Sequence, residues 1–283
     1  MRVAAQSDFL LGMAASSRVR DQRARARLSD AQQRSQLLCK EPPVPLMLAA
    51  EGFDIIAEIK KRSPAEGELA AALASLTQQA DAYVKGGAAT LSVLTEPEQF
   101  CGSLDDLHEV AEHVPTTPVM RKDFLVSRYQ VREARLAGAS GVLLIAAILD
   151  ADQLKAMLDV AFELQMFVLL EIFDRADLDK AVPVLERCGP AIEAGGRCNF
   201  MLGVNCRDLR TLKVDFGHFE RMAPALPAGI PWVAESGVNA SAQAGTLAAL
   251  GYRLALVGTA LMRSGDPAAT VRDFRTAGVA ACL

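Results

Sequence analysis

The chain has 283 residues, of which 51% are apolar, and a formal net charge of −4 at pH 7. This length allows one large buried core, and without a strongly basic block nothing indicates a nucleic-acid-binding surface. The six cysteines include no C-x-x-C pair and the three histidines are not spaced as ligands, so neither a disulfide framework nor a metal site is predicted. A reducing compartment, the cytoplasm, fits this pattern.

Residues 1–50 are predicted to form a helical extension. The apolar run "DFLLGMAASS" at 8–17 is short, only Arg2 precedes it as a basic residue, and the arginine-rich "RVRDQRARAR" follows at 18–27. A secretory signal would have a more basic start and would be followed by a mature domain. We therefore interpret the stretch as an amphipathic helix. No run in the chain reaches the roughly 20 apolar residues of a membrane span.

From residue 51 onward, short apolar runs alternate with segments of helical spacing. The runs are residues 55–59, 89–94, 118–121, 141–146, 167–171, 200–205, 231–235 and 254–258. Continuous apolar runs joined by helices indicate parallel strands that are covered on both faces. Eight such units predict one domain, a (β/α)8 TIM barrel over residues 51–283. The irregular segment 186–199 is predicted to be a loop or a lengthened connection before the sixth strand.

The predicted strands end in polar residues. Glu58 and Lys60 alternate at the end of the first strand, so their side chains share a face. The corresponding groups at later strand ends are Lys122, Glu171, Asn205, Glu235 and Ser236. Taken alone, "EIKKR" could be a helix face with ordinary ion pairs or a solvated strand end. Because barrel sites lie at the carboxyl ends of the strands, and unpartnered buried charges are costly, the set together indicates a polar reaction centre.

Two turns near the end of the chain carry a second signal. "ESGV" at 235–238 and "VGTALM" at 257–262 each place a glycine just after a strand and before a helix. Backbone N–H groups at such turns, together with a helix N-terminus, bind phosphate. One such turn usually marks only a turn, but barrels often bind phosphate after strands seven and eight. The pair therefore favours a phosphorylated ligand.

The motifs between about residue 50 and 263 are "IAEIKKRSP", "SVLTEPEQFCGSLDDL", "PVMRKDFLVSRYQVREARLAGASGVLLI", "LLEI", "GVNCRDL", "AESGV" and "LVGTALMR". In this order they resemble the indole-3-glycerol-phosphate synthase family, whose barrel also has an additional N-terminal helical segment. The resemblance implies that 1-(2-carboxyphenylamino)-1-deoxyribulose 5-phosphate is closed to indole-3-glycerol phosphate, with loss of carbon dioxide and water. It implies no cofactor and no metal.

The resemblance also implies roles for the residues that match the motifs. Lys122 corresponds to the general acid that protonates the substrate ketone as the ring carbon attacks, and Glu171 to the base of the later dehydration. Glu58 and Lys60 correspond to the first-strand pair that handles hydroxyl and acidic groups of the substrate. Whether Lys60 also donates a proton in the dehydration stays open.

The remaining matched residues are implied to bind the substrate. The polar wall that orients the sugar hydroxyls and the anthranilate end comprises Asn205, Arg207, Glu235 and Ser236. The phosphate site comprises Ser63, Gly237, Gly258 and Thr259. The aromatic cover of the anthranilate ring comprises Phe100 and Phe124, although core packing would explain either phenylalanine taken alone.

Some positions depart from the family pattern. Cys206 stands where asparagine or serine is frequent, Phe173 where histidine is common, and Glu66 where lysine is frequent. The connection from Glu171 to Asn205 is about a dozen residues longer than expected and is predicted to lie mainly on the far side of the barrel. None of these departures removes a proposed catalytic group, so an active enzyme is predicted.

Two alternatives remain at this stage. The first is a paralogue in a specialised pathway, acting on the same or a substituted anthranilate substrate, for which Phe173 and Cys206 leave room. The second is a non-catalytic barrel that binds a phosphosugar or a partner protein, which would be expected to lack one of the catalytic groups. The predicted partner is a phosphorylated small molecule, with no nucleic acid and no membrane. A monomer is compatible with the sequence, which does not determine the oligomeric state.

Overall fold

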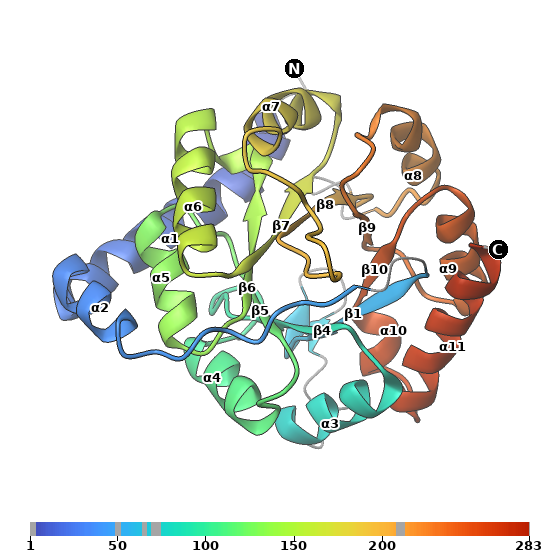
Figure 1. The fold of residues 1–283 in the computed structure, drawn as a ribbon, viewed down its shortest axis with the longest axis horizontal. Helices are drawn as coiled ribbons and strands as arrows, with labels where there is room; N and C mark the ends of the chain where they lie inside the picture. Colours follow the sequence, from blue (N-terminus) through green and yellow to red (C-terminus); the bar gives the residue numbers. More distant parts are fainter. Residues whose placement is uncertain (1–3, 49–51, 64–66, 69–74, 208–212, 283) are drawn as a thin grey trace.

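The structure is a computed structural model that describes residues 4–48, 52–63, 67–68, 75–207 and 213–282. Its centre is a closed barrel of eight parallel strands in the order β1-β10-β9-β8-β7-β6-β5-β4 (Figure 1). The barrel strands are β1 Asp54–Ile59, β4 Thr90–Leu94, β5 Val119–Lys122, β6 Gly141–Ile145, β7 Phe167–Ile172, β8 Phe200–Asn205, β9 Trp232–Glu235 and β10 Leu254–Val257. The predicted TIM barrel is confirmed.

Helices surround the barrel on its outside (Figure 1). They are α3 Leu76–Gly86, α4 Leu104–His113, α5 Arg128–Leu136, α6 Ala151–Glu163, α7 Arg175–Leu185, α8 Gly217–Met222, α9 Ser241–Ala249, α10 Thr259–Met262 and α11 Pro267–Ala281. The 3-10 helices η2 Ala146–Ile148 and η3 Ala223–Ala225 interrupt two connections, and the short strands β2 Arg62–Ser63 and β3 Gly67–Glu68 pair after β1.

Local sequence explains where many of these helices begin. Ser75, Ser103 and Ser127 each precede a helix in extended conformation, and each side chain accepts a hydrogen bond from a backbone N–H of the first turn. Asp150 and Asp174 do the same for α6 and α7. These caps satisfy donors that the helix itself leaves unpaired, so they fix the residue at which each helix begins.

The strands are buried on both faces, as their composition predicts. Every residue of β1, β7 and β8 is buried, because one face of each strand fills the barrel interior and the other packs against the helices. The predicted runs 231–235 and 254–258 differ from the observed strands by one residue at one end, and the run 118–121 is shifted by one residue from β5. The polar groups at the strand ends therefore emerge together at one end of the barrel.

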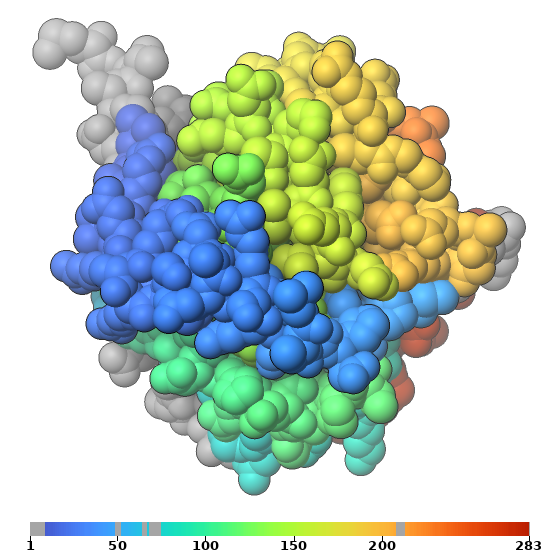
Figure 2. Space-filling model, turned by 60° about the vertical axis from the view of Figure 1, so that its left-hand side comes forward, coloured from blue at the N-terminus to red at the C-terminus, as the bar shows by residue number. Residues whose placement is uncertain are grey.

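The N-terminal segment consists of α1 Ala4–Arg27 and α2 Asp30–Leu37. It lies against one side of the barrel beside α5, as the blue atoms of Figure 2 show. The Arg132 guanidinium is paired with Asp30 at 2.6 Å, and the Gln33 amide donates to the Tyr129 carbonyl at 3.1 Å. The predicted helical leader is thus observed as two helices that pack on the helix layer.

The segment 186–199 forms backbone pairs at the amino-terminal end of the barrel, the far side from the strand ends that carry the polar groups. Met47 and Arg197 form an antiparallel bridge, and the Cys198 N–H donates to the Leu46 carbonyl at 2.8 Å. The chain between α2 and β1 crosses this end of the barrel (Figure 1), and Leu46 is buried there. Among the described helices, none has both the length and the hydropathy that crossing a membrane requires.

Candidate active site

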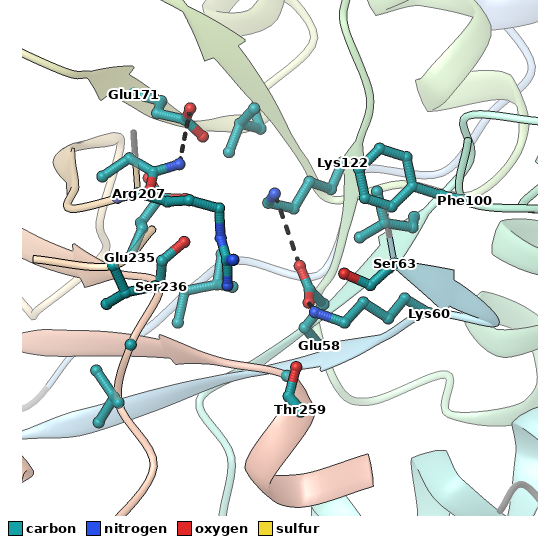
Figure 3. A pocket seen from close by; sticks show the side chains of 18 of the residues that line it. Glu58, Lys60, Ser63, Phe100, Lys122, Glu171, Arg207, Glu235, Ser236 and Thr259 are labelled. Carbon is teal, nitrogen blue, oxygen red and sulfur yellow. Dashed lines mark hydrogen bonds and ion pairs between the residues drawn. The ribbon is translucent and has the colours of Figure 1, made fainter. Parts of the chain in front are cut away.

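A pocket of about 220 Å³ opens at the carboxyl ends of the barrel strands. All the candidate site residues line it, and Figure 3 shows how their side chains converge from different strands. They are Glu58, Lys60, Ser63, Phe100, Lys122, Phe124, Glu171, Asn205, Arg207, Glu235, Ser236, Gly237, Gly258 and Thr259. Glu66 lies outside the described residues.

One side of the pocket holds two lysines around one carboxylate. Lys60 Nζ lies 2.6 Å from Glu58 Oε2, and Lys122 Nζ lies 3.6 Å from Glu58 Oε1. Burial opposes ionisation of Glu58, but the two ammonium groups outweigh it and hold the pKa of Glu58 below its ordinary value. Burial likewise opposes the charge of Lys122, and the carboxyl groups of Glu58 and Glu171 raise its pKa above the ordinary value. Lys122 is therefore a protonated acid at neutral pH.

The opposite side of the pocket holds two further carboxyl groups. Asn205 Nδ2 donates to Glu171 Oε1 at 3.2 Å, and both carboxyl oxygens of Glu235 are buried without a hydrogen-bond partner among the described residues. Burial raises the pKa of Glu171, with Lys122 opposing the shift. Burial and the neighbouring Glu171 raise the pKa of Glu235 well above its ordinary value. The two carboxyl groups therefore titrate together and hold a proton more tightly than ordinary carboxyl groups do, while the Lys122 ammonium favours their ionised form.

Backbone turns form the end of the pocket near β9 and β10. Ser236 and Gly237 both have left-handed backbone conformations, with φ of 71° and 73°, and successive residues of this kind can turn their N–H groups toward an anion. Gly258 immediately precedes α10, which begins at Thr259. A Cβ at Gly258 would collide with the Glu58 carboxylate and approach Lys60 Nζ to 2.9 Å, so a larger residue here would displace the Glu58–Lys60 pair.

Aromatic rings cover another wall of the pocket. The ring centroids of Phe100 and Phe124 lie 6.3 Å apart, and those of Phe9 and Phe124 lie 6.2 Å apart in an edge-to-face arrangement. The buried Glu96 carboxylate accepts hydrogen bonds from the backbone N–H groups of Gln99 and Phe100 and so fixes the turn before the Phe100 ring. An aromatic wall of this kind fits a flat ring of a ligand.

The wall between β8 and β9 is closed by local hydrogen bonds. The Arg207 N–H donates to Asn205 Oδ1 at 3.0 Å, and Arg207 bridges to Val214. Cys206 is buried, and its thiol donates to the Ser236 carbonyl at 3.4 Å. The Cys206 thiol thus contacts the turn that carries Ser236. Phe173 is half-buried at the edge of the site, where its carbonyl contacts the His218 ring nitrogen at 2.8 Å.

The structure adds Phe9 to the site and shows what the neighbours of Lys122 contact. Phe9 comes from α1 and lines the pocket beside Phe124; no local signal in "DFLLG" indicates this, because the contact depends on how the extension docks. Arg121 and Asp123 flank Lys122, and they pair with each other at 3.1 Å. Arg121 also pairs with Glu133 of α5, so it binds the helix layer.

Within the described ranges, no group of His, Cys, Asp and Glu side chains is arranged to hold a metal ion.

The arrangement combines groups suited to acid–base chemistry. The half-buried, protonated Lys122 faces the buried carboxyl group of Glu171 across the pocket. A second lysine, Lys60, is paired with Glu58. Such a site can donate a proton at one point of a bound molecule and accept one at another. The glycine turns supply backbone donors for an anionic end of the same molecule.

Comparison with known proteins agrees with this chemistry. The family model described as "Indole-3-glycerol phosphate synthase" matches residues 13–274. The protein named indole-3-glycerol phosphate synthase from Mycobacterium leprae strain TN is 44% identical over 240 residues, covering 83% of each chain. The protein of the same name from Mycobacterium tuberculosis is 43% identical over 239 residues, covering 84% of this chain and 82% of the other.

Similar solved structures support the fold. The 3-hexulose-6-phosphate synthase from Salmonella typhimurium matches with a TM-score of 0.62 at 16% identity, covering 81% of this chain and 100% of that one. A thiamine phosphate pyrophosphorylase from Pyrococcus furiosus matches with a TM-score of 0.56 at 14% identity, covering 82% and 97%. At this identity the likeness concerns the barrel alone. The family match over most of the chain is decisive: this protein belongs to the indole-3-glycerol phosphate synthase family.

Proposed function

We propose that this protein is an indole-3-glycerol phosphate synthase of tryptophan biosynthesis. It converts 1-(2-carboxyphenylamino)-1-deoxyribulose 5-phosphate into indole-3-glycerol phosphate, carbon dioxide and water. The observation that carries the proposal is the pairing of a protonated Lys122 with the Glu171 carboxylate across one pocket, in a chain of this family. The family relatives establish a decarboxylating lyase, and the residue roles below are our assignment.

Ring closure is the first step. The aromatic carbon that bears the carboxylate attacks the ketone carbon of the sugar chain, and Lys122 transfers a proton to the ketone oxygen, which becomes a hydroxyl. Glu58 holds the Lys122 ammonium at 3.6 Å on its side of the pocket. Because the reacting carbons belong to one bound molecule, holding the substrate folded supplies much of the rate enhancement.

Decarboxylation and dehydration complete the reaction. The bond to the carboxyl carbon breaks, carbon dioxide leaves, and its electron pair restores the aromatic ring. The hydroxyl formed from the ketone then takes up a proton and leaves as water, while the Glu171 carboxylate removes a proton from the adjacent carbon that is bonded to nitrogen. The electron pair of that C–H bond becomes the double bond of the indole. The Asn205 amide, hydrogen-bonded to Glu171 at 3.2 Å, orients this base. Lys60, paired with Glu58, is the second ammonium available to the departing hydroxyl.

Binding assignments follow from the walls of the pocket. We assign the phosphate to Ser63, Gly237, Gly258 and Thr259, the sugar hydroxyls and anthranilate carboxylate to Arg207, Glu235 and Ser236, and the anthranilate ring to Phe100 and Phe124. We also propose a monomer as the working unit. We further assign residues 1–50 as an extension of the 51–283 barrel, and the cytoplasm as the site of action.

The test mixes the purified protein with the carboxyphenylamino-deoxyribulose phosphate and follows indole fluorescence at neutral pH. We expect wild-type turnover and a loss of about 10²–10⁴-fold in kcat for Lys122→Met, since general acids contribute on this scale. Binding of a reduced, unreactive substrate analogue, measured by calorimetry, should survive the substitution. Substrate binding without wild-type turnover would instead favour a binding-only barrel, and turnover of substituted rings alone would favour a specialised paralogue.

A further inference from the structure

The chain leaves the barrel sheet directly after Lys122. β5 pairs with β6 as far as Arg121 and with β4 as far as Lys122, and the Thr95 N–H donates to the Lys122 carbonyl at 3.0 Å. Beyond this point the segment up to α5 has no strand ladder. Side chains therefore fix the position of the loop that follows Lys122, here called the β5–α5 loop (residues 123–127).

Asp123 is the first residue of this loop, and its carboxylate is fully buried. It accepts hydrogen bonds from the backbone N–H of Phe124 at 2.8 Å, from Thr95 Oγ1 at 2.8 Å and from Arg121 Nη2 at 3.1 Å. The pKa of Asp123 is far below its ordinary value, because Arg20 and Arg121 outweigh the cost of burial. The carboxylate thus anchors the backbone between two residues that line the pocket, Lys122 and Phe124.

The N-terminal helix α1 makes a two-point contact with the Asp123 carboxylate. Arg20 of α1 donates from Nη1 to Asp123 Oδ2 and from Nη2 to Asp123 Oδ1, both at 2.8 Å. A bidentate guanidinium–carboxylate pair fixes orientation as well as distance. Two other contacts with α1 hold the far end of the loop and the start of α5. Ser127 Oγ donates to Asp21 Oδ1 at 2.6 Å, and Gln130 Nε2 donates to Ser17 Oγ at 2.8 Å. The helix therefore holds this loop at both ends.

We propose that Arg20 is a positioning residue for Lys122. Through the Asp123 carboxylate, the N-terminal helix fixes the end of β5 and with it the place of the Lys122 ammonium opposite Glu171. Arg20 itself is absent from the pocket lining. The inference rests on the proposed function, in which Lys122 is the general acid.

The chemistry explains why this contact should affect rate more than binding. Without the guanidinium, Asp123 retains Arg121 and Thr95 but loses its only charged partner from α1 within the described chain. A shift of about 1 Å in a catalytic group can cost on the order of 100-fold in rate. The turns at Ser236 and Gly258 lie on other strands, so the anionic end of the substrate keeps its contacts.

The test substitutes Arg20→Met, which keeps most of the side-chain length and removes the charged fork. We expect kcat to fall by about 10–100-fold and KM to change by less than about threefold, with Arg20→Lys intermediate because one ammonium replaces a two-point contact. The matched control is Arg132→Met. Arg132 binds the same N-terminal segment through Asp30 and Gln33, at 2.6 and 3.0 Å, but not the β5–α5 loop. It should leave kcat within about twofold.

Each outcome decides the proposal. Equal kcat values for Arg20→Met and Arg132→Met would overturn it, as would a loss confined to KM. If Arg20→Met does not fold, Arg20→Lys carries the test, and wild-type kcat in that variant overturns the proposal. If the wild-type protein shows no turnover, the proposed function is refuted. The effect of Arg20 on the β5–α5 loop is then measured by hydrogen exchange of the backbone amides of residues 123–127. Their exchange should be faster in the Arg20 variants and unchanged in Arg132→Met.

Discussion

At the scale of single residues, the charge of Lys122 depends on its carboxylate neighbours. Burial disfavours the ammonium, and Glu58 is the first group that compensates for it, with Nζ 3.6 Å from Oε1. A general acid must be protonated to act, so the alkaline limb of the kcat–pH profile reports the pKa of Lys122. That pKa lies above the ordinary lysine value as long as Glu58 is ionised.

The Glu58→Gln variant tests whether this carboxylate sets the pKa of Lys122. Removing this carboxylate leaves the burial of Lys122 less compensated, so the pKa of Lys122 falls and the alkaline limb of kcat moves to lower pH. A kcat–pH series of the two proteins measures the shift. Glu109→Gln, at an exposed position on α4, is the control and should leave the limb in place. An unmoved limb in Glu58→Gln would mean that another group sets it.

Among the elements of the barrel, the turn between β10 and α10 brings the Glu58–Lys60 pair close to the start of a helix. Gly258 allows the Glu58–Lys60 pair to approach the backbone closely, and Thr259 begins the helix that follows. Helix starts attract anions, and the nearby Lys60 adds a full positive charge. This combination suits the phosphate of the proposed substrate, on the side of the pocket that carries the first and last strands.

Thr259→Glu tests that assignment. A carboxylate at the start of α10 would repel the phosphate dianion, so KM should rise by about tenfold or more, corresponding to at least ~1.4 kcal/mol, while kcat falls less. Steady-state kinetics with the phosphorylated substrate give both constants. Thr246→Glu, on the exposed face of α9, is the matched control and should behave as wild type. A KM that stays constant in Thr259→Glu removes this residue from the phosphate site.

Across the whole protein, a buried network of ion pairs links the N-terminal segment to the barrel. Arg20, Arg121 and Glu133 surround the Asp123 position, and Asp123 and Arg121 are almost completely buried. Leaving one member of such a group without its partner typically costs about 3–5 kcal/mol, because a buried charge then has no compensation. This network of ion pairs therefore contributes to the stability of the fold as well as to the shape of the site.

Asp123→Asn should accordingly lower the free energy of unfolding by about 3–5 kcal/mol at neutral pH. The folded pKa of Asp123 lies below its unfolded value, so its contribution is fully present above the unfolded pKa of about 3.9 and is lost progressively as pH falls from there through the folded pKa. Denaturant unfolding at several pH values should show the two proteins converging on acidification. A difference that stays constant with pH would show that Asp123 does not titrate in this way.

The order of elements and the identity of the polar residues were predictable from the sequence alone. Continuous apolar runs such as 141–146 and 167–171 require a sheet covered on both faces, and eight of them joined by helices leave a closed barrel as the simple solution. Because side chains alternate along a strand, Glu58 and Lys60 had to share a face. The positions of the candidate residues at strand ends then implied a common pocket, which the structure contains.

Long-range packing determined which groups reach the site from outside the barrel strands. It also determined how strongly each buried carboxyl group holds its proton. Phe9 and Arg20 lie about a hundred residues from Phe124 and Asp123 in the sequence, and no local periodicity specifies how α1 docks. Likewise, the sequence does not show that Glu171 and Glu235 meet in one buried site, where burial raises the pKa of both carboxyl groups. Local pattern determines the elements and their faces, whereas long-range packing and desolvation determine the environment of each charge.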